Sequence, residues 1–400
     1  MLKQYNADRI GLILSGGGAR AAYQVGVLRA IANILPKDAC SPFHIISGTS
    51  AGALNAASLA SHAHRLRTGV RILEHVWKNI SSDQVYVPQS GNLLGSASSL
   101  VLSMVAGKPD SPPLSLLDNT PLASLLSRVL KLERIQGNID KGFLDALSIT
   151  ASAYSSGESV SFYQGIKGLK DWSGPHRVGR RADIKLQHLL ASSAIPVLFP
   201  ATQIENQYYG DGAVRQLAPT STAIHLGARR ILAIGVSGNR LKKPSNEESS
   251  SGVENEAVGE LAIPTTPSTP DSAPEAPSLS QIIGHILNSA FVDTLENDLE
   301  FLRHMNEVLP YVPEHIKEQA EFPMHEVDLL EISPTKELNL LAAKHYDELP
   351  KTMSRYVKGS SSGTLLSLVL FEKGFCTDLM KLGFEDAMEK EQSIAQFFKH

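Results

Sequence analysis

The stretch IGLILSGGGARAAYQVGVLRAIANILPKDACSPFHIISGTSAGALNAASLAS, residues 10–61, decides the fold of this 400-residue chain. It begins with a short apolar run at residues 10–14, which is typical of a buried strand. After three glycines, apolar residues recur at helical spacing over residues 21–35. A second apolar run at residues 43–46 precedes a tight turn and an alanine-rich helix at residues 51–61. Alternation of strands and helices predicts a parallel sheet with covering helices.

The rest of the chain continues this α/β pattern. More apolar runs predict four further strands, at residues 147–152, 159–163, 230–237 and 326–333. A helix over residues 279–309 is expected to cross the sheet before the last of them, and the chain beyond Pro334 reads as mostly helical. We therefore expect a three-layer α/β/α fold with a mainly parallel central sheet, plus a helical C-terminal extension.

Composition divides the chain into four parts. Residues 240–280 are rich in Pro, Ser, Thr and Glu and contain no aromatic residue, so they cannot bury enough apolar surface to offset the entropy of ordering. We expect a disordered insertion there. It separates a catalytic core at residues 8–238 from a helix and final core strand at residues 281–335, which are followed by a helical extension at residues 336–400.

The charge balance and the cysteines exclude several protein classes. A net charge of -4 gives no basis for nucleic-acid binding, which usually needs a basic surface. Cys40 and Cys376 are the only cysteines, so a disulfide framework is excluded and a reducing compartment is the simplest assumption. No secretory signal and no run long enough for a membrane helix is visible. We expect a soluble, cytoplasmic protein, with peripheral contact to a lipid surface left open.

The pentapeptide Gly48-Thr49-Ser50-Ala51-Gly52 matches the G-x-S-x-G pattern of a nucleophile elbow. It lies between an expected strand and an expected helix, which is the context that this interpretation needs. Flanking glycines allow a strained strand-to-helix turn in which larger side chains would collide. Ser50 is therefore a candidate nucleophile.

A triple-glycine turn, Gly16-Gly17-Gly18, follows the first expected strand and is succeeded by Ala19 and Arg20. Consecutive glycines leave backbone N–H groups unshielded, which suits a phosphate or the oxyanion of a tetrahedral intermediate. A dinucleotide fingerprint would need G-x-G-x-x-G, but Ala21 stands where its last glycine belongs. Alternatively, the three glycines form an ordinary tight turn with no role in binding.

Asp211 lies between glycines in the sequence Tyr209-Gly210-Asp211-Gly212-Ala213. By itself such an aspartate is usually a turn former. It becomes a candidate for chemistry only in combination with the serine pentapeptide and the triple-glycine turn.

Together these three motifs resemble the patatin-like phospholipases, whose signatures are G-G-G-x-R/K, G-x-S-x-G and D-G-G/A. Their order and spacing fit, as does the stretch AIPVLFP at residues 194–200. The resemblance implies a Ser50–Asp211 dyad without histidine and an oxyanion hole at Gly16, Gly17 and Gly18. We expect no cofactor, and no metal either, because the sequence contains no H-E-x-x-H or C-x-x-C pattern. Supporting roles fall to Arg20, Gly48, Gly52 and Gly212.

The resemblance also implies the substrate and reaction. A glycerolipid or phospholipid would lose an acyl group through an acyl-enzyme, in the manner of a phospholipase A or lysophospholipase. Two positions depart from the family pattern: Ala21, where members often have glycine, and Leu217, where they often have asparagine. Both lie outside the reacting groups, so they put local geometry in doubt more than chemistry.

Several alternatives stay open. Ser50, Asp211 and His225 could form a triad in the order that α/β-hydrolases use. The same dyad could serve an acyltransferase, or it could be vestigial in a lipid-binding or scaffolding module. The weakly charged residues 91–121 are either a helix packed on the core or a mobile flap over an acyl pocket. Basic residues between His176 and Lys185 either meet anionic headgroups or form a solvated face.

Overall fold

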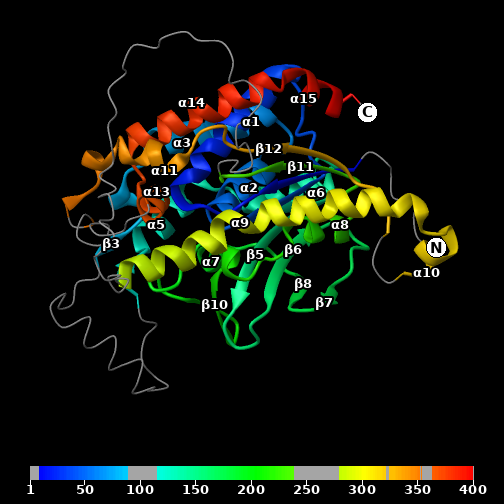
Figure 1. The fold of residues 1–400 in the computed structure, drawn as a ribbon, viewed down its shortest axis with the longest axis horizontal. Helices are drawn as coiled ribbons and strands as arrows, with labels where there is room; N and C mark the ends of the chain where they lie inside the picture. The colour runs from blue at the N-terminus through cyan, green and yellow to red at the C-terminus, as the bar shows by residue number, and fades with distance from the viewer. Residues whose placement is uncertain are drawn as a thin grey trace, which may run out of the picture.

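The computed structural model describes residues 9–88, 115–237, 279–320, 324–351, 353 and 363–399. A ten-stranded sheet runs through the middle of this part of the chain (Figure 1). Its strands follow the order β12 (Asp328–Ile332), β11 (Arg230–Ile234), β1 (Ile10–Leu14), β2 (Ile45–Thr49), β5 (Ala146–Ala153), β6 (Ser159–Gly165), β8 (Arg177–Arg181) and β7 (Trp172–Gly174), with β10 (Gln207–Asp211) and β9 (Thr202–Ile204) branching from β5.

The sheet is mainly parallel. The five strands from β12 to β5 all run parallel, and so do β6 and β8. Antiparallel pairs join β6 and β10 to β5, β9 to β10, and β7 to β8. A separate two-stranded sheet pairs β3 (Val87–Pro88) with β4 (Leu117–Asp118).

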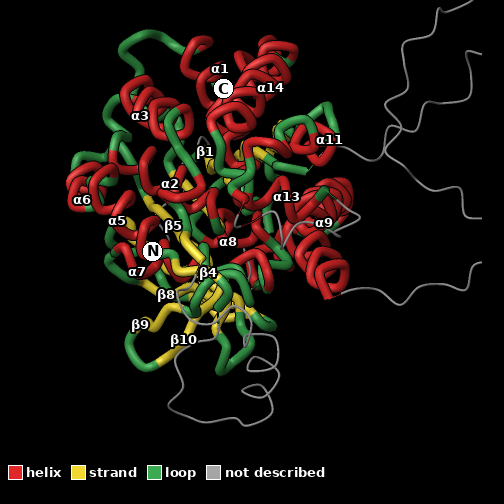
Figure 2. Tube along the Cα trace, turned by 90° about the vertical axis from the view of Figure 1, so that its left-hand side faces the viewer, coloured by secondary structure: helices red, strands yellow, loops and turns green. Residues whose placement is uncertain are grey.

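Helices cover both faces of the sheet, because alternate side chains of its strands point into two different cores. Leu12 and Leu14 of β1 pack in one core, whereas Ile13 packs in the other. The first core is covered by α1 (Ala22–Ile34), α2 (Ala51–Ser61), α3 (Leu66–Lys78) and α14 (Lys373–Glu389). The second is covered by α8 (Pro219–His225) and α9 (Leu279–Val308). Figure 2 shows α3 and α9 on opposite sides of the strands, which confirms the expected three-layer fold.

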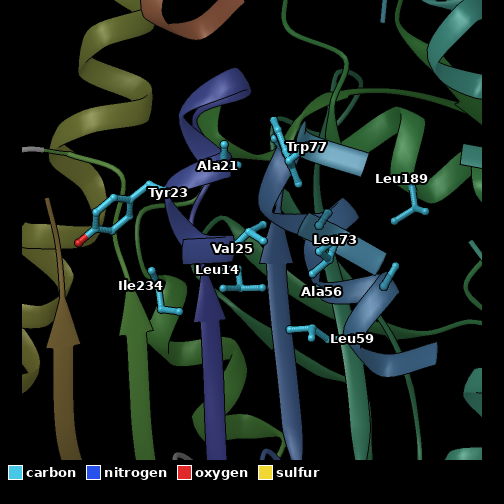
Figure 3. Close-up of a cluster of buried hydrophobic side chains, with 14 of the residues drawn as sticks. Leu14, Ala21, Tyr23, Val25, Ala56, Leu59, Leu73, Trp77, Leu189 and Ile234 are labelled. Atoms are coloured by element: carbon cyan, nitrogen blue, oxygen red, sulfur yellow. The ribbon is translucent and has the colours of Figure 1, made fainter. Parts of the chain in front are cut away.

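The core beneath α1 and α2 consists of small and aliphatic side chains. Figure 3 shows Leu14 of β1 beside Val25 of α1, with Ala56 and Leu59 of α2 nearby. The alanines of α2 allow a close approach to β2: a Cβ atom built on Gly48 would lie 2.7 Å from the Ala56 methyl carbon. This tight packing fixes the turn between β2 and α2.

Shorter helices and the C-terminal region complete the described structure. They are α5 (Thr120–Val129), α6 (Glu133–Asp140), α7 (Leu186–Ser192), α10 (Glu314–Gln319), α11 (Leu338–Ala343), α13 (Thr364–Val369) and α15 (Glu391–Phe397), together with short 3-10 turns such as η1 (Gly18–Ala21) and η3 (Gly212–Val214). The helices after β12 form the expected helical extension. No helix among the described residues is long and apolar enough to cross a bilayer.

The strand expected at residues 43–46 begins at Ile45 and runs to Thr49, because its parallel register matches Gly11 with Ile45 and Leu14 with Gly48. The insertion expected at residues 240–280 lies outside the described residues, apart from Leu279 and Ser280, with which α9 begins.

Candidate active site

Ser50 occupies the sharp turn between β2 and α2. Its φ and ψ angles are 54° and −131°, a left-handed conformation that an L-residue adopts only under constraint. Gly52 permits the turn, since a Cβ atom there would lie 2.3 Å from the carbonyl oxygen of Leu14 and 2.5 Å from that of Ser15. The predicted elbow is thus present as a strained turn packed directly against the end of β1.

Asp211 is the last residue of β10, and its pairing with β5 brings it to the elbow. The Ser50 hydroxyl donates a hydrogen bond to Asp211 Oδ2 at 2.5 Å, although 161 positions separate the two residues. The other carboxylate oxygen, Oδ1, accepts from the Ala213 amide at 2.9 Å. Gly212 is required for this approach, because a Cβ atom there would lie 2.1 Å from the Thr150 carbonyl oxygen.

Burial changes the acidity of this carboxyl group. Asp211 is completely buried, and desolvation raises its pKa to about 7, although the hydrogen bonds from Ser50 and from the Ala213 amide act in the opposite direction. A free aspartate is a weak base at neutral pH, whereas a carboxylate with a pKa near 7 matches the working range of a general base.

The triple-glycine turn leads from β1 into η1, whose first residue is Gly18, and lies next to the elbow. Gly18 has a φ of 54°, and a Cβ atom built on it would lie 2.1 Å from the Leu368 carbonyl oxygen of α13. Gly17 has similarly little room, because its Cβ atom would lie 2.4 Å from a methyl carbon of Val236. Gly18 and Ser50 line the same cavity, so the structure brings the predicted turn and the predicted nucleophile together.

A chain of buried amides ties this turn to α2 and α3. Gln24 donates to the Ser15 carbonyl oxygen at 2.8 Å. Asn55 in turn donates to the Gln24 side-chain oxygen at 2.9 Å, and the Trp77 indole donates to Asn55 at 2.9 Å. Gln24 and Asn55 are fully buried. Because a peptide unit is planar, holding the Ser15 carbonyl also fixes the direction of the Gly16 N–H.

Arg20 anchors the turn to the C-terminal helices. Its guanidinium donates to Ser367 of α13 at 2.9 and 2.7 Å and to Asn339 of α11 at 2.8 Å. The side chain is only 3% exposed. This geometry favours a supporting role for Arg20 in orienting the turn, rather than contact with a lipid phosphate.

Ser50 opens onto a narrow apolar cavity of about 60 Å³. The α2 residues Ala51, Leu54, Asn55 and Ser58 form one stripe along its wall. The remaining wall comes mainly from α3, α5 and two phenylalanines. Within residues 91–121, the segment expected to be a helix or a flap, residues 91–114 lie outside the described residues. The helix α5 begins at the end of this segment and contributes Leu122, Leu125 and Leu126 to the wall.

Sequence reasoning missed Ser192, at the end of α7. Its hydroxyl accepts a hydrogen bond from the Ser50 amide at 2.9 Å and donates to the Thr150 carbonyl at 2.6 Å. Gln216, which bonds to Thr49 and to the Thr150 hydroxyl, was missed as well. The only available signal was the position of Ser192 just before the AIPVLFP stretch.

His225 does not join the site. Its ring stacks on Trp172 at 5.0 Å, and its Nδ1 atom lies 2.7 Å from the Ser221 carbonyl oxygen. Within the described structure, the Asp211 carboxylate accepts hydrogen bonds from the Ser50 hydroxyl and the Ala213 amide, and no imidazole is among its partners.

Arg181, one of the basic residues between His176 and Lys185, donates to the backbone carbonyls of Gly165, Ile166 and Leu169. In the described part of the chain no group of three or more His, Cys, Asp or Glu residues could hold a metal ion.

Comparison with known proteins decides the family. The model of the patatin-like phospholipases matches residues 12–224, which include β1, the elbow and Asp211. The chain belongs to the patatin-like phospholipase family. That family comprises lipid acyl hydrolases, a class of carboxylic ester hydrolases.

Individual patatin-like relatives are distant. A cGAMP-activated phospholipase of Pseudomonas aeruginosa is 25% identical over 222 residues, which are 54% of this chain and 55% of the relative. Patatin-like phospholipase domain-containing protein 7 of Mus musculus is 25% identical over 237 residues, 59% of this chain and 14% of that protein. The chain therefore matches about half the length of the first relative and a small part of the second.

Among solved structures, the chain matches human GIVD cytosolic phospholipase A2 in complex with methyl γ-linolenyl fluorophosphonate. It is 13% identical, with a TM-score of 0.43, and the match covers 99% of this chain and 60% of that one. VipD from Legionella pneumophila is also 13% identical, with a TM-score of 0.30, and the match covers 91% of this chain and 67% of that one.

Proposed function

We propose that this patatin-like protein hydrolyses acyl esters of glycerolipids, with Ser50 as the nucleophile and Asp211 as the general base. The observation that carries the proposal is the 2.5 Å contact between the Ser50 hydroxyl and Asp211 Oδ2, with Ser50 lining an apolar cavity. Phospholipase A or lysophospholipase activity is the leading version.

The proposed reaction uses both residues of the dyad and the triple-glycine turn. Asp211 takes the hydroxyl proton as Ser50 Oγ attacks the ester carbonyl carbon, and the carbonyl oxygen becomes an oxyanion held by N–H groups of Gly16, Gly17 and Gly18. The tetrahedral intermediate collapses, the C–O bond to the alcohol breaks, and protonated Asp211 returns its proton to the leaving oxygen. Asp211 then deprotonates a water molecule, which attacks the acyl carbon. The C–O bond to Ser50 Oγ breaks, Asp211 returns the proton to Oγ, and the fatty acid is released.

Peripheral contact with a lipid surface belongs to the same proposal. Val214 and Leu217 follow Asp211 closely in the chain and are 37% and 74% exposed. Tyr154, which lies against Gly210, is 54% exposed. Exposed apolar and aromatic side chains near a catalytic carboxylate suit an enzyme that draws its substrate from a bilayer, and such contact is compatible with a cytoplasmic location.

The test combines a covalent probe with a lipid panel. A fluorophosphonate probe should label the wild-type protein. It should label the Asp211→Asn variant more weakly or not at all, and it should not label Ser50→Ala. Release of fatty acid is measured from phospholipid, lysophospholipid and triglyceride, with folding checked by circular dichroism. Robust hydrolysis by folded Asp211→Asn would contradict the dyad, and an unlabelled wild-type protein would favour a non-catalytic lipid-binding role.

A further inference from the structure

A second hollow, of about 680 Å³, lies where the loop before β2 meets the turn between α2 and α3. Its walls differ from those of the cavity at Ser50, because nearly all of its side chains are polar or charged. The lining includes the cations Lys37, Arg65, Arg67 and Arg71, together with His64 and a single acidic residue, Asp38. A volume of this size suits a small molecule, but one without a large apolar part.

The four cations have no carboxylate partner among the described residues, and the nearby Asp38 forms no ion pair with them. By contrast, Arg29 and Lys78 do have a carboxylate partner, because Glu74 of α3 lies 3.4 Å from both. The chain as a whole has a net charge of -4. A concentration of unpaired positive charge in a concave site therefore marks a local attraction for anions.

Two further features favour a specific anion over diffuse counterions. The Arg67 Nε atom is buried and has no hydrogen-bond partner in the described structure, whereas Nη2 makes a long hydrogen bond of 3.4 Å to the Leu35 carbonyl. In addition, α3 begins at this hollow, with Arg65 as its N-cap and no side chain capping its first turn. The amino end of a helix carries partial positive charge, which adds to that of the arginines.

The hollow is remote from Ser50. Ser50 follows the carboxyl end of β2, whereas Lys37 and Asp38 precede its amino end, and α2 spans the distance between the elbow and His64. At a rise of about 1.5 Å per residue, the eleven residues of α2 separate the two sites by roughly 16 Å. A ligand in this hollow is therefore not the ester being cleaved.

We propose that this hollow is a binding site for a hydrophilic, phosphate-bearing anion. Arg67 and Arg71 would supply paired N–H donors, which match phosphate oxygens in a way that a lysine cannot. The phosphate could belong to a soluble compound or to a lipid headgroup, since both present the same oxygens. The site does not depend on the proposed hydrolase activity.

The experiment measures binding to the full chain by isothermal titration calorimetry, with inorganic pyrophosphate and ATP as soluble probes. Vesicles of phosphatidylcholine, with and without a phosphoinositide, test the lipid source by co-sedimentation. The variants are Arg71→Gln alone and Arg67→Gln with Arg71→Gln. Arg134→Gln is the matched control, because Arg134 is an exposed helical arginine outside the hollow. Ser50→Ala separates this site from the active site.

We expect saturable binding that weakens at least about tenfold in the double variant, since each charge-assisted hydrogen bond contributes about a decade or more. Arg134→Gln and Ser50→Ala should bind like the wild type. Binding to phosphoinositide vesicles alone, lost in the double variant, would support the site with a lipid as its source. The proposal fails if no probe binds, if the double variant binds unchanged, or if Arg134→Gln or Ser50→Ala loses binding equally.

Discussion

The Ser192 hydroxyl holds the backbone of Ser50, accepting its amide hydrogen bond at 2.9 Å while donating to the Thr150 carbonyl at 2.6 Å. Ser192 therefore bridges the strained elbow to the neighbouring strand β5. The backbone of Ser50, with its φ of 54°, persists only because surrounding contacts over-determine it. Ser192 is one of those contacts, so we expect it to influence the proposed reaction by positioning Ser50.

Replacing Ser192 with alanine should lower kcat by roughly 10- to 100-fold, because small displacements of a nucleophile have effects of this order. KM should change little, since Ser192 is not among the cavity residues. The measurement is steady-state hydrolysis of a soluble ester. Ser148→Ala is the matched control: Ser148 lies in β5, is fully buried, and its hydroxyl has no partner in the described structure. Equal losses in both variants would contradict a positioning role.

The rate of hydrolysis should depend on pH through Asp211. Desolvation raises the pKa of this carboxyl to about 7, and only the ionised form can take the proton of Ser50. Below pH 7, kcat/KM should fall about tenfold per pH unit, with a plateau above it. A pH–rate profile on a neutral ester provides the check. An acid limb centred near 4, where an unperturbed aspartate titrates, would show that burial does not control this base.

The raised pKa of Asp211 should also be visible in how the free energy of unfolding changes with pH. Because the folded-state pKa is raised above that of the unfolded chain, the contribution of Asp211 is fully present below pH 4 and is lost as pH rises toward 7. Asp211→Asn lacks this titration. Its free energy of unfolding relative to wild type should rise by about 1.4 kcal/mol per pH unit between about 4.5 and 7, then level off. Urea unfolding at several pH values tests this, and a pH-independent difference would contradict it.

The sequence predicted those features that are encoded locally. Strand, glycine turn and helix follow one another along residues 10–61 with clear changes of hydrophobic period, so β1, α1, β2 and α2 could be expected from the residues alone. The strand β10, which carries Asp211, could not be predicted in this way. β10 has five residues, two of them glycine and aspartate, and it exists because it pairs with β5 and β9.

Contacts between distant segments were equally hidden. The donors around the triple-glycine turn, Gln24 and Asn55, look like ordinary helical residues until α1 and α2 pack side by side. The amphipathic helix α3 and the helix α5 also went unpredicted, although both supply walls of the cavity. Tertiary packing, rather than local propensity, decides which of these side chains reach the site.

The amide chain behind the triple-glycine turn should matter for catalysis. Gln24→Met keeps the length of the side chain but removes the donor to the Ser15 carbonyl, so the Gly16 N–H loses its fixed direction. Loss of one oxyanion donor typically lowers kcat by about 10²–10³, and we expect an effect up to that size with little change in KM. Ser61→Ala is the control, because in the described part of the chain its hydroxyl bonds to the Ala57 carbonyl within α2 and not to the turn. A change confined to KM would argue against this role for Gln24.

Arg20 should stabilise the fold by joining the turn after β1 to the C-terminal helices. Arg20→Met removes its charged donors to Ser367 and Asn339 inside the protein, which should lower the free energy of unfolding by on the order of 3 kcal/mol. Arg29→Met provides the comparison. Arg29 is half exposed, pairs with Glu74 at 3.4 Å, and should contribute below about 1 kcal/mol. Urea unfolding of both variants at one pH measures the difference. If Arg20→Met is no less stable than Arg29→Met, the C-terminal helices are held in place by apolar packing alone, and the turn does not depend on them.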